Sequence, residues 1–171
     1  TSETGSITGF FSVLVEGDDL DEPVSDAVRG ILDGHVVLSR DLARRYHYPA
    51  IDVLGSVSRL EPKIVTRAHR EAAGVLRRHM AVYRDAEDLI NAGIYQEGSN
   101  QEIDEAIQVR PRINDFLQQE IEEASPLSAT RSHVLELAGV EDDTAVPSTE
   151  TNGESGIAQE QASTPSDELE D

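Results

Sequence analysis

A long stretch of apolar residues at helical spacing, which begins just after Pro62, constrains the fold more than any other feature. Its apolar positions recur every three or four residues and stop at Gly93. This spacing places them on one side of an α-helix, and Pro is well tolerated in a first helical turn. We therefore predict one long amphipathic helix here, or two shorter ones, that must bury an apolar side against other elements.

Two further helical stretches follow. The first opens after a loop at Gly98 to Asn100, and we expect Pro111 to interrupt it before a separate helix that carries Phe116. The second spans Leu127 to Leu137 and ends at Gly139, a residue type that commonly terminates helices. Residues 63–140 are therefore predicted to form a small helical bundle.

The chain before Pro62 has a different pattern, in which strand-like stretches alternate with short helices. The strand-like stretches are Ser6 to Val15, His35 to Ser39 and Ala50 to Arg59. We expect the first two to be buried strands, because they are rich in β-branched and apolar residues. Ser25 and Asp26 are predicted to cap a helix that runs through Leu32. This alternation indicates the edge of an α/β sheet.

The acidic residues are concentrated towards the end of the chain. Residues 120–171 hold 14 acidic side chains and 1 basic one, whereas residues 1–119 hold 20 and 13. Residues 141–171 have no aromatic side chain and too few apolar ones to offset the entropy cost of ordering. We predict that they form a disordered acidic tail, which either aids solubility or binds a partner.

Composition also excludes several classes of function. A formal charge of −20 opposes binding to nucleic acid, and the absence of Cys excludes disulfides, thiolate metal sites and thiol nucleophiles. No apolar run approaches the roughly 18 residues that a membrane-spanning helix needs. The five His have no spacing typical of a metal site, so we assign no metal to this chain.

The stretch Pro49 to Ser58, PAIDVLGSVS, carries the most informative motif. It reads Pro, a small residue, an aliphatic residue, Asp, three variable positions, Ser, one variable position and Ser, with Arg59 next. This pattern resembles the signature of rotary ATP synthase subunits, both catalytic and non-catalytic. Flanking stretches at Gly5 to Arg40 and Ala86 to Ile107 are similar to the flagellum-specific and type III secretion ATPases.

The resemblance covers about residues 1–120 and implies both a fold and an activity. The implied fold is α/β plus α. Residues 1–62 would form the carboxy-terminal edge of a RecA-like nucleotide-binding core, 63–140 a helical domain, and 141–171 the tail. The implied activity is ATP hydrolysis that powers protein export. ATP and Mg²⁺ would then be the cofactors, with the Mg²⁺ held by residues outside this chain.

No G-x-x-x-x-G-K-[ST] phosphate loop occurs in the sequence, and the chain begins at Thr1, close to a strand-like stretch. We therefore expect a piece of a longer protein that is inactive by itself. An alternative is a non-catalytic subunit or binding module of a rotary-type ATPase assembly, because such subunits keep the same signature.

The resemblance also implies three site residues. Arg59 would be an arginine finger that acts on the neighbouring subunit's nucleotide. Tyr48 would lie against the adenine in its own subunit, and Phe116 would form the far wall of that pocket. From the residues alone, Arg59 is more typical of a surface or ion-paired Arg than of a catalytic one. Tyr48 is also compatible with a core or rim aromatic beside Tyr46, and Phe116 fits a core residue of an amphipathic helix at least as well.

The implied partners are the other subunits of a homohexamer, export-apparatus stalk and regulator proteins, and substrate–chaperone complexes. The implied location is cytoplasmic, peripheral to the inner membrane. Independently of the resemblance, the long helix carries a basic stripe, defined by Arg67, Arg70, Arg77 and Arg84. We expect this stripe either to pair with Glu71, Asp85 and Glu87 or to dock an acidic partner.

Overall fold

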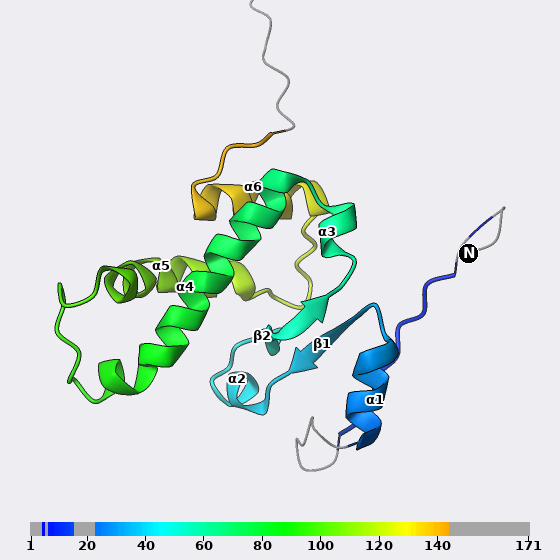
Figure 1. Cartoon of the computed structure of the whole chain (residues 1–171), viewed down its shortest axis with the longest axis horizontal. Helices are drawn as coiled ribbons and strands as arrows, with labels where there is room; N and C mark the ends of the chain where they lie inside the picture. Colours follow the sequence, from blue (N-terminus) through cyan, green and yellow to red (C-terminus); the bar gives the residue numbers. More distant parts are fainter. Residues whose placement is uncertain (1–4, 6, 16–22, 144–171) are drawn as a thin grey trace, which may run out of the picture.

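The computed structural model describes residues 5, 7–15 and 23–143 and contains a small sheet region and a bundle of helices (Figure 1). Along the chain the elements are α1 (Pro23–Ile31), β1 (Gly34–Leu38), α2 (Arg40–Arg44), β2 (Ile51–Ser58), α3 (Glu61–Ile64), α4 (Arg67–Asn91), α5 (Gln101–Leu117) and α6 (Leu127–Ala138). None of the described helices is long and apolar enough to cross a membrane.

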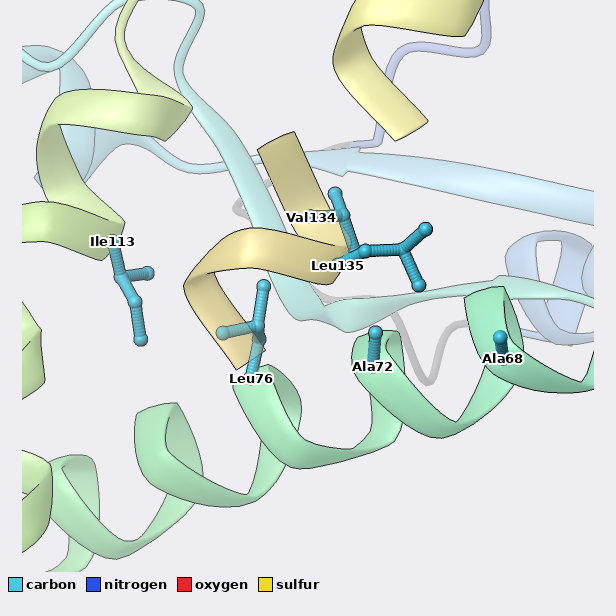
Figure 2. Close-up of a cluster of buried hydrophobic side chains, with 6 residues drawn as sticks. All are labelled: Ala68, Ala72, Leu76, Ile113, Val134 and Leu135. Carbon is cyan, nitrogen blue, oxygen red and sulfur yellow. The ribbon is translucent and has the colours of Figure 1, made fainter. Parts of the chain in front are cut away.

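The stretch after Pro62 forms one long helix, α4, preceded by the short helix α3. Pro62 lies in the first turn of α3, and Thr66 caps α4 by accepting a hydrogen bond from His69 N at 3.2 Å. The buried side chains of α4 include Ala68, Ala72 and Leu76, which lie one turn apart and face α6 (Figure 2). Because two of them are alanines, the helices can approach closely around a shared core.

Helices α5 and α6 complete that core. Ile113 of α5 is 2% exposed, and Val134 and Leu135 of α6 pack in the same cluster (Figure 2). The predicted end of the last helix is confirmed, since Gly139 follows α6 in a left-handed conformation with φ 66°. The helical bundle expected from the apolar periodicity is therefore present.

The expected interruption at Pro111 is wrong, because α5 runs continuously from Gln101 to Leu117 with Pro111 inside it. A proline removes one backbone hydrogen bond from a helix interior and costs about 3 kcal/mol in an isolated helix. The residues that follow it recover that cost through packing. Ile113 is fully buried, and Phe116 and Leu117 pack against the same core.

The first residues of the predicted tail also differ from expectation. Asp142 forms an ion pair with Arg131 of α6, and Asp143 Oδ2 accepts a hydrogen bond from Ala68 N, in the first turn of α4, at 3.2 Å. A carboxylate is stabilised at that end of a helix by unpaired N–H groups and the helix dipole. The chain is thus part of the bundle as far as residue 143, and the rest of the predicted tail lies outside the described residues.

The sheet region departs furthest from the prediction. Strands β1 and β2 pair antiparallel, with Gly34 opposite Ser58 and Leu38 opposite Ile51. β1 is a strand as expected, but it is not buried, since Val36 and Leu38 are 66% and 72% exposed. Residues 7–15 form no strand, and the apolar side chains of residues 7–14 are exposed. A strand needs a hydrogen-bonding neighbour, and no described segment pairs along residues 7–15.

Helix α1 begins at Pro23, so Ser25 and Asp26 lie within the helix and not at the predicted capping position before it. Pro is favoured at the first helical position, because its fixed φ suits a helix and its missing N–H is not needed there. α1 ends close to the sheet and leads directly into β1 (Figure 1).

Candidate functional site

The PAIDVLGSVS motif forms an irregularity in strand β2. The register with β1 is broken between His35 and Val37, whose partners on β2 are Val57 and Asp52, so the intervening residues bulge out of the ladder. The Asp52 carboxylate accepts hydrogen bonds from Leu54 N and Gly55 N, each at 3.0 Å. The motif Asp therefore satisfies the backbone groups that the bulge removes from the sheet.

Ser56 and Gly55 complete the bulge. The Ser56 hydroxyl donates to Asp52 O at 2.6 Å and accepts from Val37 N at 3.0 Å, which replaces a missing ladder bond. A Cβ on Gly55 would lie only 3.0 Å from an oxygen of the Asp52 carboxylate, which would then have to shift, so glycine suits this close approach. The motif residues thus shape the strand that ends immediately before Arg59.

Arg59 leaves the end of β2 with an exposed side chain. Its backbone N–H donates to Asp33 O at 2.8 Å, which extends the strand pairing by one residue. Its guanidinium donates to Gly30 O at 2.9 Å and to Arg29 O at 3.2 Å, near the end of α1. The negative end of a helix dipole and its unpaired carbonyls favour a cation at this place. No carboxylate pairs with Arg59 among the described residues, so its charge is not neutralised there.

Tyr48 lies at the other end of β2, in the turn that leads into the strand. Its ring is 49% exposed. Its backbone is anchored to the helical bundle, because Gln119 N, just after α5, donates to Tyr48 O at 2.9 Å. The two ends of β2 lie as far apart as the ends of β1, which is roughly 13 Å for strand geometry. Tyr48 and Arg59 extend beyond those ends, so they do not form one compact cluster.

Tyr46 has an unusual backbone conformation beside Tyr48. Its φ of 60° is the one positive value at a non-glycine residue in the described part of the chain. Tyr46 N and His47 N donate to Ala43 O and Leu42 O, each at 3.0 Å. Many helices end with this pair of hydrogen bonds, and the residue at the position of Tyr46 is then normally Gly. A residue other than Gly in this left-handed backbone conformation costs about 1 to 2 kcal/mol of stability. The two rings meet edge-on, with centroids 5.5 Å apart.

Charged groups of the bundle surround this turn. Arg45 forms an ion pair of 2.9 Å with Glu87 of α4, and this bond raises the pKa of Arg45. Burial, and then the charge of Arg110 on α5, lower the pKa of His47 below its usual value of 6.5. Arg110 itself stacks over the ring of Tyr83 at 4.6 Å. Both effects favour the neutral form of the imidazole next to Tyr48.

Phe116 is placed in the bundle. It packs against the buried cluster and meets the ring of His133 edge-on, with centroids 5.0 Å apart. These contacts are those of a core residue in an amphipathic helix. The end of α5 nevertheless approaches the Tyr48 turn through Gln119, three residues further on. The described contacts do not bring the Phe116 and Tyr48 rings together.

Sequence reasoning missed several partners at these sites. The positive φ of Tyr46 has no signal in the sequence, because Tyr is a poor residue for that conformation. The bonds from Arg59 to α1 and from Gln119 to Tyr48 join residues that are distant in sequence. The described residues contain no group of His, Asp and Glu side chains that could hold a metal ion.

The basic stripe pairs differently from the prediction. Arg77 forms a forked contact with Glu61 of α3, at 3.0 and 3.3 Å, instead of pairing within α4. Glu87, an expected partner of the stripe, instead forms an ion pair with Arg45, which lies just after α2. Both of these ion pairs therefore join α4 to another segment of the chain.

Comparison with known proteins identifies the family. Residues 65–136 match the model described as T3SS EscN ATPase C-terminal domain, and residues 1–58 match the ATP synthase alpha/beta family, nucleotide-binding domain. In both regions the chain is similar to the flagellar and type III secretion ATPases. The family resemblance inferred from the PAIDVLGSVS motif is thereby confirmed.

Individual relatives agree with this assignment. The chain is 52% identical over 136 residues to the flagellum-specific ATP synthase of Treponema pallidum (strain Nichols), covering 80% of this chain and 30% of the relative. It is 53% identical over 121 residues to the SPI-2 type 3 secretion system ATPase of Salmonella typhimurium (strain LT2), covering 71% and 28%. The chain thus spans about 30% of the length of the curated relatives it matches.

A solved structure shares the fold. The assembled ATPase EscN from the type III secretion system of enteropathogenic E. coli, in complex with its central stalk EscO, is 38% identical. It superposes with a TM-score of 0.72 over 81% of this chain and 32% of the EscN chain. The mixed α/β sheet region and the helices after it therefore have the arrangement seen in that family.

Proposed function

We propose that this chain is the carboxy-terminal part of an ATPase that hydrolyses ATP to power protein export through a flagellar or type III secretion apparatus. Residues 1–62 contribute the edge of a RecA-like nucleotide-binding core, and residues 63–140 a helical domain. The observation that carries the proposal is the exposed guanidinium of Arg59 at the end of β2, directly after a bulge built by the PAIDVLGSVS motif.

In this proposal Arg59 is an arginine finger that acts on the nucleotide of the neighbouring subunit. A guanidinium stabilises the charge that develops on a transferring phosphoryl group, and its planar fork can bind two oxygens at once. Its carbonyl partners on α1 are neutral, so the positive charge is available to a phosphate. The location of Arg59 and Tyr48 at opposite ends of β2 supports action on two different nucleotides.

Tyr48 lies against the adenine of the nucleotide bound by its own subunit. The half-exposed ring on an anchored backbone suits stacking with a base, because little freedom is lost on binding. Phe116 forms the far wall of the adenine pocket. The closeness of the end of α5 to the Tyr48 turn supports this role, whereas the packing of the Phe116 ring against His133 favours a structural one.

ATP is the substrate, and Mg²⁺ is held by residues outside this chain. The bound Mg²⁺ would neutralise phosphate charge, while Tyr48 orients the base and Arg59 reaches the neighbour. Because this chain lacks the backbone cradle and Lys of a phosphate loop, we expect the isolated chain to bind no ATP. Titration of the chain with Mg-ATP by calorimetry should give no binding heat, and micromolar binding would contradict the assignment.

The partners follow from the same proposal. EscN was solved as an assembly with its central stalk EscO, which supports a homohexamer with a stalk partner for this protein as well. Regulators of the export apparatus and substrate–chaperone complexes would dock on the helical domain, where Arg70 and Arg84 are exposed. The assembly would be cytoplasmic and lie at the inner membrane only peripherally.

Mixing of subunits tests the central claim. In the full-length protein, Arg59→Ala and a variant of the phosphate-loop Lys are each expected to be inactive as homogeneous assemblies. Mixed assemblies should recover activity, because some boundaries pair an intact finger with an intact loop. If the mixture stays inactive although the subunits co-assemble, Arg59 does not act across the boundary.

The alternative is a non-catalytic subunit or binding module. It is favoured by the fact that the PAIDVLGSVS bulge and Arg59 are compatible with either kind of rotary ATPase subunit. A full-length protein that binds ATP without hydrolysing it, in the presence of its stalk partner, would support this alternative.

A further inference from the structure

We propose that Tyr46 is a positioning residue, which holds the ring of Tyr48 in the orientation that receives the adenine base. This inference rests on the proposed function, in which Tyr48 lies against adenine. The carrying observation is the edge-on contact of the two rings, with centroids 5.5 Å apart and ring planes at 89°. Aromatic pairs favour this geometry, so it restrains the rotation of both side chains.

The backbone of Tyr46 gives an independent reason. Its left-handed conformation is one in which Gly is strongly preferred, and its side chain is 83% exposed. Burial of the ring therefore does not offset the unfavourable backbone. Strained residues of this kind persist mostly at functional sites. Within the described chain, the Tyr46 ring has an aromatic contact with Tyr48, so we infer that the ring at this position acts on the orientation of Tyr48.

The surroundings explain why the Tyr48 ring needs a positioning residue. The Tyr48 backbone is already fixed by the hydrogen bond from Gln119 N at 2.9 Å. The ring itself is 49% exposed and remains free to rotate about its side-chain torsions unless a neighbour restricts it. An edge-on neighbour restricts these torsions and leaves at least one face of the Tyr48 ring open. A base can then stack on that face without first ordering the ring.

The test is the substitution Tyr46→Gly in the full-length protein. Gly adopts a φ near 60° without steric strain, so the thermal midpoint should stay unchanged or rise by a few degrees. The ring contact is lost, so the dissociation constant of ATP, measured by calorimetry, and KM should both rise about two- to tenfold, with kcat nearly unchanged. Tyr46→Phe keeps the ring and should retain the original affinity.

A second readout needs no enzyme activity. In this chain with labelled tyrosines, Tyr46→Gly should shift the NMR resonances of the Tyr48 ring, because the ring current of Tyr46 is removed. Tyr46→Phe should leave those resonances almost in place. A lower thermal midpoint in Tyr46→Gly, together with weaker binding, would show a merely structural role and overturn the proposal.

The variant Tyr48→Ala distinguishes two ways of being wrong: that Tyr46 does not position the Tyr48 ring, or that Tyr48 does not contact adenine. If Tyr48→Ala weakens ATP binding but Tyr46→Gly does not, the positioning role of Tyr46 is wrong and the adenine role of Tyr48 stands. If Tyr48→Ala leaves binding unchanged while Tyr46→Gly weakens it, Tyr46 itself contacts the base, which overturns both. If neither variant changes binding, the adenine lies elsewhere, and both the adenine role of Tyr48 and the positioning role of Tyr46 are wrong.

Discussion

The helical bundle and the sheet region differ in how completely each buries its own apolar side chains. All eight buried hydrophobic residues of the described chain lie between Ala68 and Leu135, in α4, α5 and α6. In the sheet region Phe10 and Leu14 are 95% and 100% exposed, and Val36 of β1 is 66% exposed. The bundle supplies its own core, whereas the sheet region presents apolar surface of the kind that other segments cover.

This difference bears on the proposed function, because the candidate site residues Arg59 and Tyr48 both lie at the ends of β2, in the less buried region. The bundle contacts the turn before β2 through Gln119, which bonds to Tyr48 O, and through Glu87, which pairs with Arg45. A bundle with its own buried core thus anchors a sheet region whose apolar and charged groups are more exposed. The following predictions test this division, from the largest expected effect to the smallest.

The largest effect is expected for Arg59→Ala in the full-length protein. If the sheet edge provides the finger, turnover should fall by about 10³ to 10⁵, or roughly 4 to 7 kcal/mol of transition-state stabilisation. Nucleotide affinity and thermal midpoint should change little, since Arg59 is exposed. Arg59→Lys should recover little activity, because an ammonium lacks the planar fork. Turnover close to wild type would remove Arg59 from the site.

The second prediction compares two isoleucines in this chain. Ile113→Ala removes a side chain that is 2% exposed in the bundle, so the free energy of unfolding should fall by about 2 to 5 kcal/mol. Ile31→Ala is the matched control at the end of α1, where the side chain is 83% exposed, and should change stability by less than about 0.5 kcal/mol. Urea unfolding measures both. Equal losses would contradict the self-contained core.

The third prediction locates the end of the bundle. Truncation after Asp143 should leave the thermal midpoint unchanged, because residues 144–171 have too few apolar side chains to form a core. Truncation after Val140 removes the partners of Arg131 and Ala68 N and should cost about 1 to 2 kcal/mol, seen as a midpoint lowered by a few degrees. If both truncations behave alike, the aspartates do not stabilise the bundle.

The smallest effect is expected at the ion pair that joins the two regions. Arg45 and Glu87 have side chains that are 64% and 27% exposed, so solvent screens their attraction. Glu87→Gln should lower stability by no more than about 1 kcal/mol, and the loss should shrink at high salt. Asp41→Asn is the control, since Asp41 pairs with Arg44 within α2. A loss of several kcal/mol would mean that the regions depend on each other far more than their burial indicates.

The sequence by itself determined the elements whose signals are local. The periodicity after Pro62 predicted α4, and Gly139 marked the end of α6, because each signal acts within a few residues. The PAIDVLGSVS motif identified the family and pointed to Arg59 and Tyr48. Its Asp52 bonds to backbone groups two and three residues away, so part of this information is also local.

Only the tertiary structure decided the features that depend on distant partners. Pro111 stays within α5 because Ile113 and Phe116 pack on the bundle, and residues 7–15 form no strand because no described segment pairs along them. The guanidinium of Arg59 meets the end of α1, Asp143 caps α4 from 75 residues away, and Tyr46 adopts a conformation that its residue type disfavours. Such contacts depend on where the chain returns in space, which short-range preferences do not encode.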